Sequence, residues 1–273
     1  MSSPASLSAD RNVASRKQGK TPPLWSSHRL AIIAAKPVPA RRFIGILLFL
    51  LPPAAGLIAF WFVPPIVQPE SYHLFADQRR LLGIPNFWNV VSNLPFAVAG
   101  LAGLMAFRDL GSRLLFAGIF LTTFGSAYYH WAPDTPRLAC DRLPITVAFM
   151  ALLALLIQVS FGARAGRWLL LPLVAVGLLS VVWWRMTGDL RLYLLVQFAP
   201  MLMIPVALVF LEIPGRSELW IAVVLYALAK IGEFYDTQIF SHMFLSGHTF
   251  KHLLAGASTW SIYRWRRSAS AFQ

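Results

Sequence analysis

The feature that most constrains this chain is a series of long segments without charged side chains. A helix needs about 20 apolar residues to cross the hydrocarbon core of a bilayer. Windows of this kind recur seven or eight times, at 43–67, 88–107, 114–133, 143–163, 168–184, 192–211, 219–240 and 242–263. Hydrophobic residues make up 57% of the sequence and charged ones 13%, which excludes an ordinary soluble domain. The sequence therefore predicts an all-α integral membrane protein.

The last two windows are the weakest, because ionisable side chains interrupt them. They contain three histidines together with Lys230, Glu233, Asp236 and Lys251. Ionisable groups within a span are costly and usually face a cavity or a partner. We therefore expect a polar feature inside the helix bundle near the end of the chain.

The positive charge indicates how the chain is oriented. Lys and Arg number 24, and the net charge is +13. With eight spans and the basic N-terminus inside, 16 of these residues fall on the inner side, six in outer loops and two within the weak spans. This bias predicts that both termini are cytoplasmic. Since the charge is concentrated in the N-terminal tail and the short loops, no nucleic-acid partner is expected.

Residues 1–42 differ in composition from the remainder. They contain eight Lys and Arg but only one acidic residue, Asp10, among many Ser, Ala and Pro. This composition predicts a disordered basic tail. An organelle transit peptide and a cytoplasmic anchor tail share it, and both remain open.

Five polar side chains stand at the ends of spans, where a lipid-facing helix would not place them. In the eight-span arrangement, Ser126 and His130 lie at the outer end of the third span, and Asp141 lies at the outer start of the fourth. His248 and His252 lie near the outer start of the last span. All five are therefore expected at a similar depth, on the side opposite the termini.

The spacing of these residues indicates a metal site. His248 and His252 are four residues apart, so both imidazoles project from one face of a helix and can bind one ion. A third imidazole from His130 leaves one tetrahedral position for water, as in catalytic zinc sites. Ligands of this type favour zinc, although iron, copper and nickel also accept them.

Each of these residues also has a plainer interpretation. Asp141 precedes Arg-Leu-Pro and could cap a helix N-terminus. Ser126 could bond back to a carbonyl of its own helix. We expect Arg142 to be interfacial, and Lys251 either to extend to the lipid headgroups or to pair with Glu233. Three polar residues of the second window are expected to form interhelical hydrogen bonds or support the site, namely Asn89, Ser92 and Asn93.

The remaining histidines and the single cysteine are not expected to bind metal. We interpret His28, His73 and His242 as tail, hydrogen-bonded or interfacial residues. Cys140 is the only cysteine, so an intramolecular disulfide is excluded, and we expect a small buried thiol.

The pattern Ser-x3-His-x10-Asp, followed late in the chain by His-x3-His, resembles the CREST superfamily of membrane hydrolases. That group includes alkaline ceramidases, PAQR/adiponectin receptors and Per1 lipid-remodelling proteins. Within it, the segment NFWNVVSNLPF at 86–96 is similar to the start of the first core helix of alkaline ceramidases.

The resemblance covers residues 70–264 and implies a seven-transmembrane helix bundle. Residues 43–67 would then be an additional N-terminal transmembrane helix, and 265–273 a C-terminal tail. The family implies zinc held by His130, His248 and His252. Zinc-activated water would cleave the amide bond of a ceramide-like membrane lipid, with Asp141 as general base and Ser126 stabilising the oxyanion. No obligate protein partner is inferred.

One departure concerns calcium. Alkaline ceramidases also bind calcium through acidic residues before the first core helix, including a glutamate at the position of Asn86. The upstream acidic pattern is not recognisable here, although Glu70 and Asp77 could supply oxygens. A calcium site is therefore not favoured.

Two other functions remain open from the sequence. An ester-cleaving hydrolase or remodelling enzyme of the same superfamily would use the same residues. A receptor or transporter without enzymatic activity is supported only by the ionisable residues of the weak spans. Internal repeats, which many transporters contain, are not evident.

Overall fold

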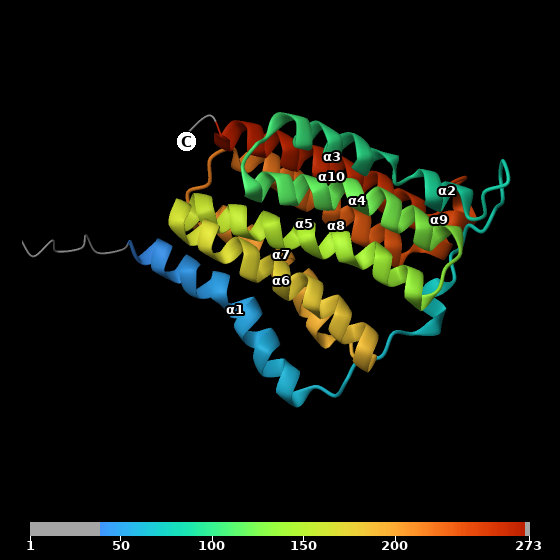
Figure 1. The fold of residues 1–273 in the computed structure, drawn as a ribbon, viewed down its shortest axis with the longest axis horizontal. Coiled ribbons are helices and arrows are strands. Elements are labelled where there is room, and N and C mark those ends of the chain that lie inside the picture. Colours follow the sequence, from blue (N-terminus) through green and yellow to red (C-terminus); the bar gives the residue numbers. More distant parts are fainter. Residues whose placement is uncertain (1–38, 271–273) are drawn as a thin grey trace, which may run out of the picture. The chain divides into compact units, whose positions relative to one another are not determined.

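In the computed structural model, residues 39–270 are described, and they form a bundle of helices joined by short connections (Figure 1). The elements are α1 (Ala40–Phe62), η1 (Glu70–His73), α2 (Phe87–Val91), α3 (Leu94–Ala106), α4 (Leu110–Trp131), α5 (Thr135–Phe161), α6 (Ala163–Thr187), α7 (Arg191–Phe210), α8 (Arg216–Phe234), α9 (Asp236–His242) and α10 (Gly247–Ser270). The predicted all-α architecture is confirmed.

Every predicted apolar window falls largely on helix. Within the described residues, six helical segments are long and apolar enough to cross a membrane: α1, the consecutive helices α2 and α3, α4, α5, α6 and α7. This composition indicates a multi-pass membrane protein. Helices α8 and α10 do not qualify, and they are the two windows that the sequence marks as weakest.

Several helix boundaries differ from those expected. Helix α1 begins at Ala40, so Arg41 and Arg42 belong to it rather than to the tail. It ends at Phe62, because Pro64 and Pro65 follow and cannot continue it. Helix α10 extends to Ser270, beyond the expected domain end at 264. The prediction of a disordered tail otherwise concerns residues 1–38, which lie outside the described part of the chain.

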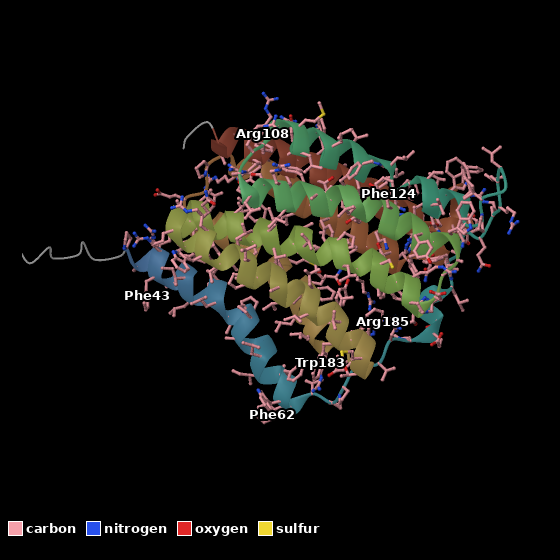
Figure 2. All side chains as sticks on the ribbon, viewed as in Figure 1. Phe43, Phe62, Arg108, Phe124, Trp183 and Arg185 are labelled. Atoms are coloured by element: carbon pink, nitrogen blue, oxygen red, sulfur yellow. The ribbon has the colours of Figure 1, made fainter. Side chains whose placement is uncertain are left out.

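Apolar side chains cover the outer flank of the bundle. Phe43 and Phe62 of α1, Phe124 of α4 and Trp183 of α6 are all exposed (Figure 2). Phe62 is 81% exposed. Large exposed apolar areas are rare on soluble monomers and common where lipid covers a surface. The flank therefore has the character of a membrane-facing surface.

Helix α5 is the central element of the bundle. Every residue from Met150 to Ile157 is buried, and the helix packs against α4 on one side and α6 on the other. A helix that is apolar all round is one that is covered all round. Helix α1, in contrast, buries only Gly45 and Phe49 and packs along α7. It is thus a peripheral addition to the bundle.

A glycine allows α4 and α5 to approach closely at the level of Ser126 and Asp141. A Cβ atom on Gly125 would lie 2.3 Å from the backbone oxygen of Cys140. No larger residue fits without moving one of the helices. The contact brings the Ser126 face of α4 against the Asp141 turn of α5.

We expect Gly125→Ala to destabilise the protein by about 1–3 kcal/mol through overpacking. At an open helical position the same change stabilises by roughly 1 kcal/mol, so the sign of the effect is diagnostic. Thermal unfolding in detergent measures it. Ala175→Val, which enlarges an exposed residue of α6, is the control and should change little. A Gly125→Ala protein more stable than wild type would contradict the close contact.

Candidate metal centre

The three predicted histidine ligands lie at one end of the bundle. His130 is the penultimate residue of α4, whereas His248 and His252 occupy the first turns of α10. Helices α2 and α9 lie at this same end, on the right of Figure 1. The structure therefore brings together residues separated by more than a hundred positions in the sequence.

The three imidazoles form a compact triangle. Each pair of ring centroids is 4.8 Å apart, and the candidate ligand atoms all lie within 4.8 Å of one another. The side chains are nearly inaccessible, with His130 1%, His248 5% and His252 4% exposed. Among residues 39–270, this is the one group of His, Cys, Asp or Glu arranged to hold a metal ion.

The distance between two ligand atoms fits zinc coordination. Nε2 of His130 lies 3.3 Å from Nε2 of His248. Two nitrogens on one tetrahedral zinc, each about 2.0–2.1 Å from the ion, lie roughly 3.3 Å apart. The donor set and its spacing therefore suit a single ion bound by three imidazoles.

The turn between α2 and α3 places a side chain that contacts His252. Asn93 donates its side-chain amide to the carbonyl of Asn89 at 2.8 Å, and α3 then begins at Leu94 with Pro95 in its first turn. The turn directs the Ser92 hydroxyl to within 2.8 Å of Nδ1 of His252. A partner on Nδ1 fixes the ring and leaves Nε2 for the metal. This result agrees with the expected supporting role of Ser92.

Asp236 positions the start of α10. Its Oδ1 accepts the backbone N–H of His248 at 2.7 Å, and its Oδ2 accepts the N–H of Ala76 at 3.0 Å. The preceding Phe75 packs its ring 4.6 Å from the rings of both His130 and His248. The segment before α2 thus covers the histidines and excludes water from that side.

The acidic residues considered for calcium have other roles. Asp77 is buried and accepts two hydrogen bonds from the Arg79 guanidinium, at 2.8 and 2.6 Å. Asn86 adopts a left-handed backbone conformation, with φ of 46°, and donates its amide to the His130 carbonyl at 2.8 Å. Glu70 is exposed in η1. None of these three residues belongs to the group of metal-ligating side chains found among residues 39–270, which consists of the histidines.

Ser126 and Asp141 lie beside the histidines on a common cavity. A cavity of about 490 Å³ is bordered by Ser126, Asp141 and His252. Ser126 and Asp141 come from the neighbouring helices α4 and α5, and Oδ1 of Asp141 is buried without a hydrogen-bond partner. One oxygen of a carboxylate that borders the cavity is therefore left without a partner among the described residues.

The interpretation of Asp141 as a helix cap is wrong. Helix α5 begins eight residues earlier than the predicted span, at Thr135, and Asp134 caps it by accepting the N–H of Arg137 at 2.7 Å. Asp141 therefore lies within the helix, where no capping function explains its charge.

Arg142 is also placed differently from the prediction. Instead of lying at an interface, it is 5% exposed and borders the same cavity as Asp141. Its guanidinium carbon lies 4.1 Å from the Trp184 ring centroid and 4.4 Å from that of Tyr193. Its Nη2 donates to Gln68 at 2.6 Å.

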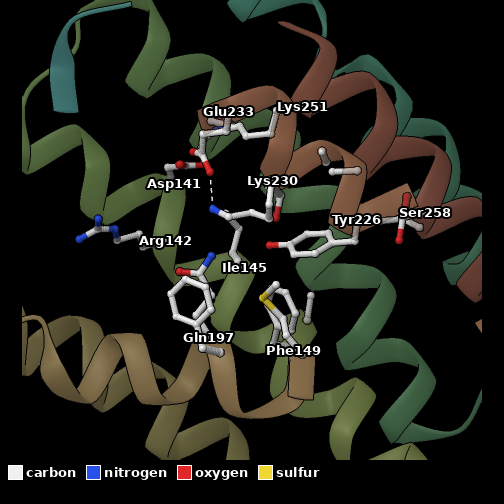
Figure 3. Close-up of a pocket in the computed structure, with 18 of the residues that line it drawn as sticks. Asp141, Arg142, Ile145, Phe149, Gln197, Tyr226, Lys230, Glu233, Lys251 and Ser258 are labelled. Atoms are coloured by element: carbon white, nitrogen blue, oxygen red, sulfur yellow. Dashed lines mark hydrogen bonds and ion pairs between the residues drawn. The ribbon is translucent and has the colours of Figure 1, made fainter. Parts of the chain in front are cut away.

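A second group of charges faces Asp141 across the cavity. Glu233 of α8 forms ion pairs with Lys230 and with Lys251, the latter at 3.0 Å. Figure 3 shows these side chains converging on the Asp141 carboxylate, with Gln197 and Tyr226 nearby. The expected pairing of Lys251 with Glu233 is confirmed, and the ionisable residues of the weak spans face a cavity.

The segment between α1 and α2 covers the cavity near Arg142. The N–H of Leu190 donates to the carbonyl of Ile66 at 2.8 Å, and Asp189 accepts the N–H of Ile66 at 3.3 Å. Hydrogen bonds from Arg191 lower the pKa of Asp189 to about 2, so this carboxylate is ionised at neutral pH. The covering segment is therefore attached to the α6–α7 connection.

The remaining candidate residues do not join the cluster. His73 bonds to the Tyr129 hydroxyl at 3.0 Å and to Thr135 at 3.1 Å, and the exposed His242 bonds within α9. Cys140 is exposed, contrary to the expected buried thiol. His28 lies outside the described residues.

Two contributors were not identified from sequence. Asp236 stands twelve residues before His248, and Phe75 precedes α2 in an irregular segment, so neither shares a helical face with a candidate ligand. A carboxylate shortly before a helix start is a weak signal for Asp236. No pattern marks Phe75. No protein-family model and no curated protein matches this chain.

Proposed function

We propose that this protein is a zinc-dependent membrane hydrolase that cleaves the amide bond of ceramide-like lipids. The observation that carries the proposal is the triangle of buried imidazoles beside a cavity bordered by Asp141, a carboxylate with one oxygen that lacks a hydrogen-bond partner. The resemblance of the Ser-His-Asp and His-His spacings to alkaline ceramidases supports the choice of an amide lipid.

The residues present suit the chemistry of amide hydrolysis. Zinc held by three imidazoles would lower the pKa of a bound water molecule and polarise the carbonyl of the amide. Asp141, whose Oδ1 has no hydrogen-bond partner, takes the proton released by water and returns it to the departing amine. Ser126, one turn before His130, donates a hydrogen bond to the oxygen that gains charge.

The apolar part of the cavity suits an acyl chain. Beyond the polar residues, the cavity is bordered by Phe96, Leu115, Ile119, Leu152 and Ile204. These side chains come from α3, α4, α5 and α7, so an acyl chain would lie between helices with its polar end toward Asp141. A ligand with one long apolar chain and one polar end matches this division.

Metal analysis combined with a substrate panel tests the proposal. The purified protein is expected to contain one zinc per chain and to release fatty acid from ceramides. Lysolipids in the same panel separate amide cleavage from the ester cleavage of related enzymes. A metal-free preparation without activity should recover on addition of zinc. Stoichiometric zinc without release from any amide or ester would contradict a hydrolase.

We further infer eight membrane crossings, with both termini cytoplasmic and the site on the opposite side. The charge bias supports this orientation, and the histidines lie at the ends of α4 and α10 that it places outside. The short connection between α4 and α5 should then be reachable from outside.

Cysteine labelling tests this topology. In a Cys140→Ser background, Pro133→Cys places a thiol between α4 and α5, and it should react with an impermeant reagent on intact cells or vesicles. Glu212→Cys, between α7 and α8, is the matched control and should react only after lysis. The reverse pattern would overturn the orientation. Reaction of both thiols from outside would overturn the number of crossings.

A further inference from the structure

Arg142 is a buried cation without an anionic partner. Among residues 39–270, no carboxylate lies within ion-pair distance of its guanidinium, whose polar partner is the neutral amide of Gln68. Its Nη1 is buried and makes no hydrogen bond. The side chain is 5% exposed and borders the cavity that contains Asp141.

This arrangement is costly unless a ligand completes it. A guanidinium carries five N–H donors and stays charged, and burying it without an anion costs several kcal/mol. The faces of Trp184 and Tyr193 offset part of this cost through cation–π contact. They supply no acceptor for Nη1. An anion in the cavity would supply both the acceptor and the missing charge.

The other charges around the cavity favour an anion as well. Lys230 and Lys251 share a single carboxylate, Glu233. Together with Arg142 they set three cationic side chains against two carboxylates, those of Glu233 and Asp141. A bound zinc ion would add further positive charge. A neutral lipid would leave this excess uncompensated in a region of low dielectric constant.

We propose that Arg142 is a binding residue for an anionic group of the ligand. The substrates would then be N-acyl lipids with a carboxylate or phosphate close to the amide. The inference rests on the proposed function only for the bond that is cleaved. For an N-acyl amino acid, the oxygen of water joins the acyl carbon and the C–N bond breaks. The products are a fatty acid and an amino acid whose nitrogen carries the transferred proton.

A matched pair of ligands tests the proposal. N-oleoylglycine and N-oleoylethanolamine share the acyl chain and the amide, but the first ends in a carboxylate and the second in a hydroxymethyl group. Ligand-induced thermal stabilisation of the full-length, zinc-loaded protein in non-ionic detergent measures binding with or without turnover. The concentration of N-oleoylglycine that gives half-maximal stabilisation should be lower than that of the neutral amide by a factor of about ten or more. This factor is the scale of one hydrogen bond to a charged group.

Two variants locate the preference at Arg142. Arg142→Met should abolish it. Gln68→Glu places a carboxylate at the Gln68 position with little change in shape, and by pairing with Arg142 it should also reduce the preference. Arg185→Met is the control, because Arg185 contacts the same Trp184 ring from outside the cavity. If Arg142→Met does not fold, Gln68→Glu and the wild-type ratio decide.

The outcomes separate this inference from the proposed function. Equal stabilisation by both ligands in wild type, or an unchanged preference in a folded Arg142→Met or Gln68→Glu protein, would overturn the anion site. Hydrolysis of both amides at equal kcat/KM would support the hydrolase and refute the anion site. Preferential binding of N-oleoylglycine without fatty-acid release would support the site and refute the hydrolase.

Discussion

Replacing Asp141 by asparagine is expected to lower amide hydrolysis by about 10²–10⁴-fold while one zinc remains bound per chain. Asparagine has nearly the same shape but cannot accept the proton released by water. The three histidines are the expected protein ligands, and zinc completes its coordination with water. Asp141→Asn should therefore lose catalytic activity while it keeps the bound metal.

Ser126→Ala is the companion variant. It removes the hydroxyl that is proposed to donate to the oxyanion, an effect of order 10²–10³ in kcat. Metal content and turnover are measured on the same preparations. If both variants keep zinc and full turnover, the roles assigned to these residues are wrong. If Asp141→Asn loses zinc while His130→Ala keeps it, Asp141 is a ligand and His130 is not.

Replacing His248 by alanine is expected to abolish most zinc binding. The loss removes one of three nitrogens that converge within 4.8 Å, and two imidazoles with water rarely hold a structural or catalytic zinc. Metal analysis after dialysis against a weak chelator measures the stoichiometry. His242→Ala is the control, because His242 is exposed on α9, bonds within that helix and is not part of the cluster.

A graded effect is expected from the residue behind the cluster. Ser92→Ala removes the 2.8 Å contact to Nδ1 of His252, and loss of such supporting contacts typically weakens metal binding by about 10–100-fold. Stoichiometric zinc retained by His248→Ala would remove the three-histidine site altogether. An unchanged zinc affinity in Ser92→Ala alone would show that the hydroxyl does not orient the ring.

Local pattern was sufficient to predict several features. The apolar windows predicted the helices, because a chain that crosses lipid must satisfy its backbone hydrogen bonds within each segment. The i, i+4 spacing placed His248 and His252 on one helical face, and the depth argument matched them to His130. The pairing of Lys251 with Glu233 was also predictable, since buried charges in a span require partners.

The conformation of the connections between helices could not be predicted from the sequence. Asp134 rather than Asp141 caps α5, and both positions offer an aspartate followed by a nearby proline. Which aspartate becomes the cap depends on where α4 ends and how tightly Gly125 lets α5 approach. Because Asp134 is the cap, Asp141 lies within α5 and borders the cavity instead of capping the helix.

The sequence alone predicted which residues could bind a metal and that His130 would meet His248 and His252 at one end of the helices, because helical periodicity and span length are local constraints. Only the tertiary structure decided what surrounds them. Arg142 looked interfacial from its position beside a span end, yet the packing of α5 against α6 and α7 encloses it among Trp184 and Tyr193. Arg142 is buried without an anionic partner because three helices pack around it. A pattern within one segment cannot show that packing, so the sequence did not reveal it.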